Sequence, residues 1–313
     1  MLPIVLKRLV GLVATLFVAS LIVFALLRLS GGDPATVLLG DNPDPDALAA
    51  LRNSMGLDDP APMQYLHWLS GILHGDLGFS YYQDKPVSDI LLPRIAPTVS
   101  LAILAQILSA VVAIPLGIAA ARRRNGPVDS AVMGVTLLGM AVPSFVIALL
   151  FAVFFGVTLK WFPVLGYKPF SEGLGPWLHT LVLPAVSLAI VHAALTIRMT
   201  RASLIDSLQQ DYVRTARAKG ASARRVVYRH ALKNAAIPIL TVIGLGFGSL
   251  VAGALVTETV FNIPGLGQLM VTSISHRDLP VIQGVVLLIT ITYALLNLAV
   301  DLLYAVIDPR ISY

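Results

Sequence analysis

The sequence predicts an all-α integral membrane protein with six transmembrane helices. Of its 313 residues, 57% are hydrophobic and only 12% are charged, and the mean hydropathy is +0.82. A soluble domain carries about 25% charged residues, so most of this chain is expected to be solvated by lipid. A bilayer core about 30 Å thick needs about 20 apolar residues in a helix. Six stretches meet this requirement: 9–27, 99–121, 131–157, 178–197, 235–257 and 281–306.

The first stretch follows Lys7 and Arg8, as the apolar part of a secretory signal peptide would. A cleavable signal has an apolar run of about 7–15 residues followed by a small-residue cleavage site. The run here is longer and no such site ends it, so we expect an uncleaved first helix.

Lysine and arginine predict the orientation of the spans, because cytoplasmic loops retain an excess of both. If the N-terminus is cytoplasmic, 15 of the 22 basic residues lie inside, nine of them in the loop 198–234. The long loop 30–97 then lies outside, and it holds nine aspartates. Both termini are therefore predicted to be cytoplasmic, in a multi-pass protein of a prokaryotic plasma membrane.

Composition and motifs exclude several classes of function. The net charge of +5 and the pI of about 9.6 come from the loops that the topology rule predicts to be basic, so they do not indicate nucleic-acid binding. Cysteine is absent, which excludes disulfides, thiolate metal sites and cysteine nucleophiles. The chain has no GxxxxGK[ST], GxSxG or HExxH motif. We expect no catalytic, cofactor-binding or metal-binding residues in this chain, and no enzymatic activity.

The segment 30–97 is too long to be a turn. It contains a helical pattern with apolar residues at three- and four-residue spacings, from Met63 to Leu73. We expect a small folded extracytoplasmic element. It could serve as a lid over the bundle, as a surface that meets a partner delivering substrate, or as both.

The loop 198–234 predicts a short capped helix between two longer ones. Asp211 can cap the N-terminus of a helix over Tyr212–Lys219, and Gly220 can supply the positive φ that ends it. Ser222 can then cap a second helix that leads into the fifth span. The candidate coupling residues are Asp211, Tyr212, Val213, Arg214, Thr215, Ala216, Arg217, Ala218, Lys219 and Gly220.

Two interpretations of this short helix remain open. Its basic residues could rest on anionic headgroups at the membrane surface. Alternatively, it could dock into a cytosolic protein, because a helix of two turns is marginal in water and a surrounding groove would stabilise it.

Ionisable residues are nearly absent from the predicted spans, and His192 is the one titratable side chain clearly within them. A proton-coupled carrier or a channel typically needs such groups along its pathway, so the energy source is expected to lie outside this chain. Pro143, Ser144 and Glu258 are candidates for the pathway or a gate. The glycines of the fifth span could serve either close helix packing or hinges.

Many short motifs along nearly the whole chain resemble those of the permease subunits of ABC importers for dipeptides, oligopeptides and nickel. The closest resemblance is to the peptide-type permease with a long first extracytoplasmic loop. The residues that carry it are Gly32-Asp33-Pro34, Gly56-Leu57-Asp58, Gln64-Tyr65, Trp68-Leu69, Gly75–Gly78, Ser80, Arg94, Pro97-Thr98, Pro143-Ser144-Phe145, Tyr212–Gly220, His230–Leu232, Asn234, Glu258–Gly267 and Asp308-Pro309-Arg310.

The resemblance departs from the family's cytoplasmic signature, in which Glu-Ala-Ala is followed by three residues and Gly. Ala216 and Gly220 match, whereas Arg214 and Thr215 replace the Glu and the first Ala. Lys233 likewise replaces the proline of a later Leu-Pro pair. Peptide-type members show similar departures, but a salt bridge of the missing Glu cannot be assigned here.

The resemblance implies a type I ABC importer permease bundle in two parts: residues 1–97, with the first helix and the extracytoplasmic loop, and residues 98–313, a five-helix core with the coupling helix. It implies three kinds of protein partner: a second homologous permease, two cytoplasmic ABC ATPase subunits, and an extracytoplasmic substrate-binding protein, all with membrane lipid around the bundle. ATP and Mg would be held by the ATPases, and no cofactor by this chain.

Cargo could be di- or oligopeptides, nickel chelates, glutathione or another small solute. A secondary transporter, a structural membrane protein and a membrane enzyme are the competing interpretations.

Overall fold

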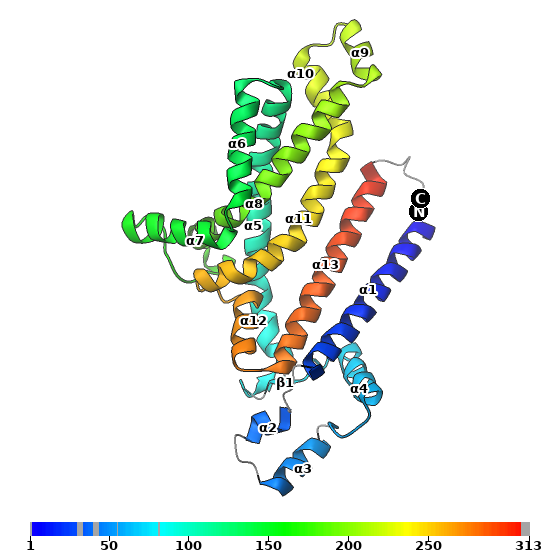
Figure 1. Ribbon diagram of the computed structural model, residues 1–313, viewed down its shortest axis with the longest axis vertical. Helices are drawn as coiled ribbons and strands as arrows, with labels where there is room; N and C mark the ends of the chain where they lie inside the picture. Colours follow the sequence, from blue (N-terminus) through cyan, green and yellow to red (C-terminus); the bar gives the residue numbers. More distant parts are fainter. Residues whose placement is uncertain (1, 30–33, 40–43, 55, 81, 308–313) are drawn as a thin grey trace. The chain divides into compact units, whose positions relative to one another are not determined.

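The computed structural model is almost entirely helical (Figure 1), and it describes residues 2–29, 34–39, 44–54, 56–80 and 82–307. The predicted motif residues Gly32, Asp33 and Asp308–Arg310 lie outside these residues. The helices are α1 (Leu2–Leu29), α2 (Pro34–Leu39), α3 (Pro45–Ser54), α4 (Ala61–Leu73), α5 (Val87–Arg122), α6 (Pro127–Ala141), α7 (Ser144–Phe151), α8 (Leu174–Leu208), α9 (Asp211–Ala218), α10 (Ala223–Arg225), α11 (Leu232–Val260), α12 (Leu266–Ser275) and α13 (Leu279–Ile307).

The remaining elements are short. Two π-helical segments, η1 (Ala152–Thr158) and η3 (Val226–Ala231), continue the helices before them, and η2 (Phe170–Glu172) is a 3₁₀ turn. Strands β1 (Phe79–Ser80) and β2 (Lys85–Pro86) pair antiparallel, with Phe79 opposite Pro86 and Ser80 opposite Lys85.

Unbroken helices cover five of the six stretches predicted to span the membrane. Among the described residues, α5, α8, the continuous run α10–η3–α11 and α13 are each long and apolar enough to cross a bilayer. In α1, the apolar part with described side chains runs from Val10 to Ala25.

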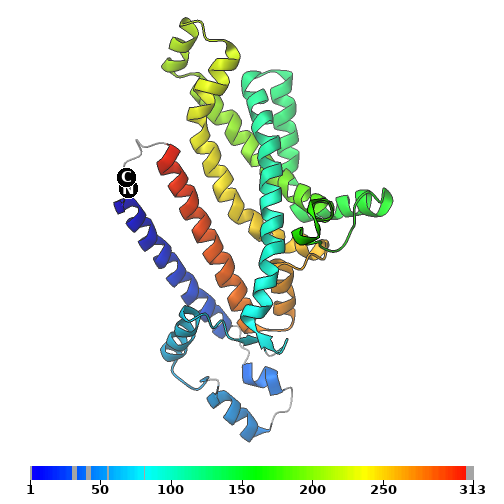
Figure 2. The same cartoon turned by 180° about the vertical axis from the view of Figure 1, so that it is seen from behind.

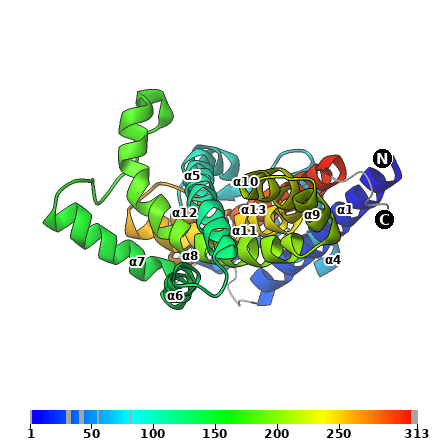
Figure 3. The same ribbon diagram turned by 90° about the horizontal axis from the view of Figure 1, so that it is seen from above.

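The remaining stretch, 131–157, was predicted as one span, and two helical segments cover it, α6 and α7 with η1, which form either a broken span or a re-entrant loop. The axes of α6 and of α7 with η1 are bent by 94° at Val142 and Pro143. A residue before proline is pushed out of the helical region, and Val142 is extended, with φ −98° and ψ 123°. Figures 1 and 3 show α7 leaving the end of α6 sideways.

The chain forms two compact units. The first comprises residues 1–96 and 265–295, and the second comprises 97–264 and 296–313. In the first unit, Val87 and Leu91 of α5 pack with Leu269 of α12 and with Val281 and Val285 of α13.

The hairpin β1–β2 is tied to the start of α13 within the first unit. Ser80 donates a hydrogen bond of 2.6 Å from Oγ to Oδ2 of Asp278, and both residues are buried. Burial raises the pKa of the Asp278 carboxyl, and the hydrogen bond from Ser80 opposes that shift. The ring of Tyr82 stacks on His276, with centroids 3.9 Å apart.

The second unit is a bundle of α5, α6, α7, α8 and α11. Its largest core joins Leu101 of α5, Leu181 and Leu188 of α8, and Leu250 of α11. Phe261, in the turn after α11, is buried in the same core, and its carbonyl accepts from the amide of Gly166 at 2.9 Å.

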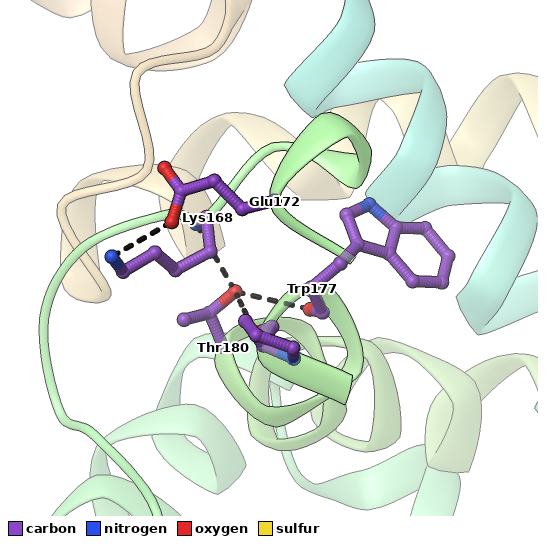
Figure 4. Close-up of polar contacts among 5 residues, drawn as sticks. Lys168, Glu172, Trp177 and Thr180 are labelled. Atoms are coloured by element: carbon purple, nitrogen blue, oxygen red, sulfur yellow. Dashed lines mark hydrogen bonds and ion pairs between the residues drawn. The ribbon is translucent and has the colours of Figure 1, made fainter. Parts of the chain in front are cut away.

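The loop from η1 to α8 is held by contacts close to the start of α8. Thr180 Oγ1 lies 3.3 Å from the amide of Lys168 and 3.0 Å from the carbonyl of Trp177. Lys168 Nζ pairs with Glu172 Oε2 at 2.8 Å. Figure 4 shows the indole of Trp177 directed away from these polar groups, and its ring meets Phe170 edge-on at 5.6 Å.

Gly117 of α5 lies tightly against α8, and it supports a test of this packing. A Cβ at Gly117 would lie 2.6 Å from Cβ of Thr200 and 3.0 Å from the carbonyl oxygen of Ile197. We expect Gly117→Ala to lower the free energy of unfolding by about 1–3 kcal/mol, as overpacking does. The measurement is thermal unfolding of the purified chain in detergent.

Gly139 of α6 provides the matched control. A Cβ there would meet Ile190 and Ala194 of α8 at 3.6 and 3.7 Å, which are ordinary contacts. Gly139→Ala should therefore leave the unfolding temperature unchanged or slightly raised. Equal behaviour of the two variants would contradict the close approach of α5 and α8 at Gly117.

Candidate functional site

The candidate site is α9 with its two flanking turns. It lies at the end of the second unit, in the segment that connects α8 to α11 (Figures 1 and 2). α8 ends at Leu208, and Gln209 and Gln210 form the connection. The chain then makes the two turns of α9 and returns through α10 and η3 into α11. All ten predicted coupling residues therefore lie in one contiguous projection.

The N-terminus of α9 differs from the prediction by one residue. Asp211 was predicted as the N-cap, but Gln210 has that place, with extended backbone (φ −70°, ψ 151°) and no capping side-chain bond. Asp211 is instead the first helical residue. Its carboxylate still complements the helix dipole there, and it lies 3.4 Å from the guanidinium of Arg214.

The C-terminus of α9 is a Schellman motif, as the predicted glycine cap requires. Gly220 has φ +79°. Its amide donates to the carbonyl of Arg217 at 2.9 Å, and the amide of Ala221 donates to the carbonyl of Ala216 at 3.1 Å. Lys219, predicted in the last turn, is the C-cap residue. The positive φ at Gly220 is confirmed.

The following helix begins as predicted. Ser222 is its N-cap, and Oγ of Ser222 accepts from the amide of Arg225 at 3.4 Å. The helix then passes through the π-helical segment η3 into α11. π-Helical turns inside α-helices are frequent at functional sites.

Val213 fixes α9 to the rest of the unit. Its side chain is fully buried, and α9 packs on η3, where Val226 and Val227 are also buried. Below them, a core cluster joins Leu204 of α8 and Ala235 of α11. Sequence reasoning did not assign this role to Val213, although it is the one large aliphatic residue among the ten.

The opposite face of α9 is exposed. It presents Asp211, Tyr212, Arg214, Thr215, Ala218 and Lys219. The side chains of Arg214 and Asp211 are 78% and 95% exposed. Ala216 is half-buried, so it lies at the edge of this face. α9 therefore has one buried valine on its inner side and a mixed polar face toward solvent.

A buried ion pair ties α8 to α6 farther along the same unit, and sequence reasoning missed it. Arg201 Nε and Nη2 bind the two carboxylate oxygens of Asp129 at 2.5 and 2.7 Å. The amide of Asn125 also donates to Asp129, at 2.9 Å. The Asp129 side chain is 5% exposed and that of Arg201 25%.

The candidate pathway residues lie on separate elements. Pro143 is the N-cap of α7 and Ser144 its first residue, both at the break after α6. Glu258 lies near the end of α11, is fully buried, and accepts a 2.6 Å hydrogen bond from Thr98 of α5. In this structure Glu258 therefore lines no solvent-exposed surface.

Within the residues that the structure describes, no group of three or more His, Asp or Glu side chains could hold a metal ion. The features of the described residues are those of a multi-pass helical membrane protein with a short exposed helix between two long ones.

The comparisons with known proteins identify the family. Residues 113–313 match the family described as the binding-protein-dependent transport system inner membrane component. Residues 1–102 match the N-terminal part described for the same systems. The chain belongs to this family of ABC importer permeases, which are membrane transport components and not enzymes. Such a permease works with ATPase subunits and a substrate-binding protein.

Relatives match over the full length. A probable peptide ABC transporter permease of Sinorhizobium fredii is 44% identical over 309 residues, 99% of both chains. The glutathione transport system permease protein GsiC of Escherichia coli is 42% identical over 313 residues, 100% of both chains. A putative peptide transport system permease of Brucella abortus is 41% identical over the whole of both chains.

A solved structure shares the fold. An inward-facing conformation of the MetNI methionine ABC transporter superposes with a TM-score of 0.58 at 18% identity, covering 70% of this chain and 96% of that one. The predicted type I importer permease fold is thus confirmed.

Proposed function

We propose that this chain forms part of the translocation pathway of an ABC importer for di- or oligopeptides. α9 would couple it to the ATPase subunits, and a second homologous permease would complete the pathway. The observation that carries the proposal is the exposed α9, ended by a Schellman motif at Gly220 and held by the buried Val213. The names of the relatives support peptides as the cargo.

The geometry indicates how α9 would act. Val213 joins α9 to η3, and α8 leads into α9 through two residues. Movement of α9 by an ATPase would therefore reach both α8 and α11. Asp129 and Arg201 would pass the movement of α8 on to α6. ATP and Mg²⁺ would be bound by the ATPases.

The same proposal fixes the orientation. The excess of basic residues in 198–234 supports a cytoplasmic position for this segment and for both termini, with the loop 30–97 outside. A substrate-binding protein would meet the outer side. The break at Pro143 and Ser144 is proposed as a hinge of the gate, and Glu258 as a buried contact that changes when the pathway opens.

Glutathione is the second candidate cargo, because GsiC is 42% identical over its full length. A nickel chelate or another small solute would use the same mechanism.

Reconstituted uptake tests the proposal. The chain would be placed in proteoliposomes with its neighbouring permease, ATPases and binding protein, and uptake of labelled dipeptides, oligopeptides and glutathione measured with and without ATP. We expect uptake of a peptide only with ATP and all subunits, and no ATP hydrolysis by this chain alone. Uptake without ATP would favour a secondary transporter. ATP-driven uptake of glutathione, without uptake of any other peptide, would identify glutathione as the cargo in place of di- or oligopeptides.

A further inference from the structure

α4 lies beside the outer half of α1, as Figures 1 and 2 both show within the first unit. Tyr65 Oη lies 2.8 Å from Oγ of Ser20, and its ring meets those of Phe17 and Phe24 edge-on at 6.4 and 5.4 Å. Trp68 also approaches Phe24, at 5.9 Å. The helix is therefore attached to α1 by one hydrogen bond and an aromatic cluster.

The position of these contacts along α1 gives the depth of α4. The apolar stretch of the first span ends at Leu27. Ser20 is seven residues earlier, which is about 10 Å along a helix. Half of the hydrocarbon core is about 15 Å thick. A bilayer centred on this stretch would put Tyr65 at the level of the hydrocarbon layer and not of the water above it.

One side of α4 is apolar and exposed among the residues that the structure describes. Met63, Leu66 and Leu73 are 48%, 55% and 78% exposed, and their spacing puts them on a single arc of the helix. The neighbouring arc carries His67 and His74. α1 also exposes apolar side chains, at Val10, Val13, Val18, Leu21 and Ile22.

The start of α4 is also suited to an apolar medium. Pro60 and Pro62 have no amide hydrogen, which leaves fewer unpaired donors at the helix start. The side-chain amide of Gln64 donates to the carbonyls of Leu57 and Asp59 at 2.7 and 2.8 Å. The side-chain amide of Gln64 is thus satisfied within the chain, as hydrocarbon requires.

We propose that α4 is a membrane-embedded helix whose Met63–Leu66–Leu73 arc lies against the acyl chains of the leaflet at the C-terminal end of α1. It would be an additional lipid contact besides the spans, and it would fix the segment 44–86 to the bilayer. A soluble partner could not reach side chains beside the middle of a span, so lipid is the occupant that the contacts with α1 favour. The inference does not rest on the proposed transport activity.

Site-directed fluorescence tests this proposal, and the absence of native cysteine makes the labelling specific. Leu66→Cys and Leu73→Cys would be labelled with bimane in the full chain in nanodiscs. His67→Cys is the matched control on the same helix, and Asp46→Cys on α3 is the aqueous control. Quenching by lipids with a mid-chain doxyl group is compared with quenching by iodide, after each variant is shown to elute as a single species.

We expect doxyl lipid to quench the labels at 66 and 73 more strongly than iodide does, and the order to be reversed at 46. The label at 67 should be more accessible to iodide than the label at 66. Iodide quenching at 66 and 73 equal to that at 46 would overturn the proposal. Protection of these sites from iodide only after addition of a substrate-binding protein would also overturn it, and would assign the arc to that partner.

Discussion

Ala218→Asp is expected to abolish assembly of the permease with its ATPase subunits and, with it, ATP-driven uptake. Ala218 is exposed on the outer face of α9, so the free chain tolerates the carboxylate. In the proposed complex the charge would be buried without a partner, which costs several kcal/mol. A loss of about 3 kcal/mol weakens binding about a hundredfold. Co-purification of the ATPases and uptake in vesicles measure the two effects.

Ala223→Asp is the matched control, because it makes the same substitution in the same loop. Ala223 is exposed and lies in the first turn of α10, where a carboxylate complements the helix dipole. It should retain assembly and uptake. If Ala218→Asp instead keeps the ATPases bound and only loosens contact with the membrane, α9 is a headgroup anchor and not the coupling element.

The two turns around α9 show what local sequence can predict. Gly220 and Ser222 were assigned correctly because each cap depends on a few consecutive residues. The start was displaced by one residue because Gln210, and not Asp211, takes the extended conformation. The position of the N-cap depends on where α8 ends, and the general preference of Asp for N-cap positions contains no information about the end of α8.

The break at Pro143 shows the limit for the spans. Sequence predicts that a proline interrupts the helix, and Val142 is extended as expected before it. The 94° angle between α6 and α7 depends on the packing of α7 against α8 and α11, where Ala148 and Ala152 of α7–η1 join the core of Leu181 and Leu250. Apolar residues at these positions are equally compatible with a straight span.

The ion pair of Asp129 with Arg201 could not be predicted, because 72 positions separate the two residues. Each is an ordinary charge near the end of a predicted span. Only the packing of α6 along α8 brings them together and buries the carboxylate of Asp129. Their contribution to stability is therefore a property of the fold, and it can be measured.

Arg201→Leu is expected to lower the free energy of unfolding by about 3–5 kcal/mol, the loss typical of a buried pair that keeps one charge. Asp129, 5% exposed, would retain only the amide of Asn125. Asp129→Leu should cost less, because the guanidinium of Arg201 is 25% exposed and can turn toward water. Unfolding of the purified chain in detergent by heat and by denaturant measures both variants.

The double variant Asp129→Leu with Arg201→Leu should be more stable than Arg201→Leu alone, since no charge is then left buried. The exposed pair of Asp211 and Arg214, 3.4 Å apart, is the control, and Arg214→Leu should change stability by no more than about 1 kcal/mol. Strictly additive effects of the two single variants would contradict a direct interaction. A coupled loss would show that α6 and α8 are held together by this pair, as transmission of movement from α9 through α8 to α6 requires.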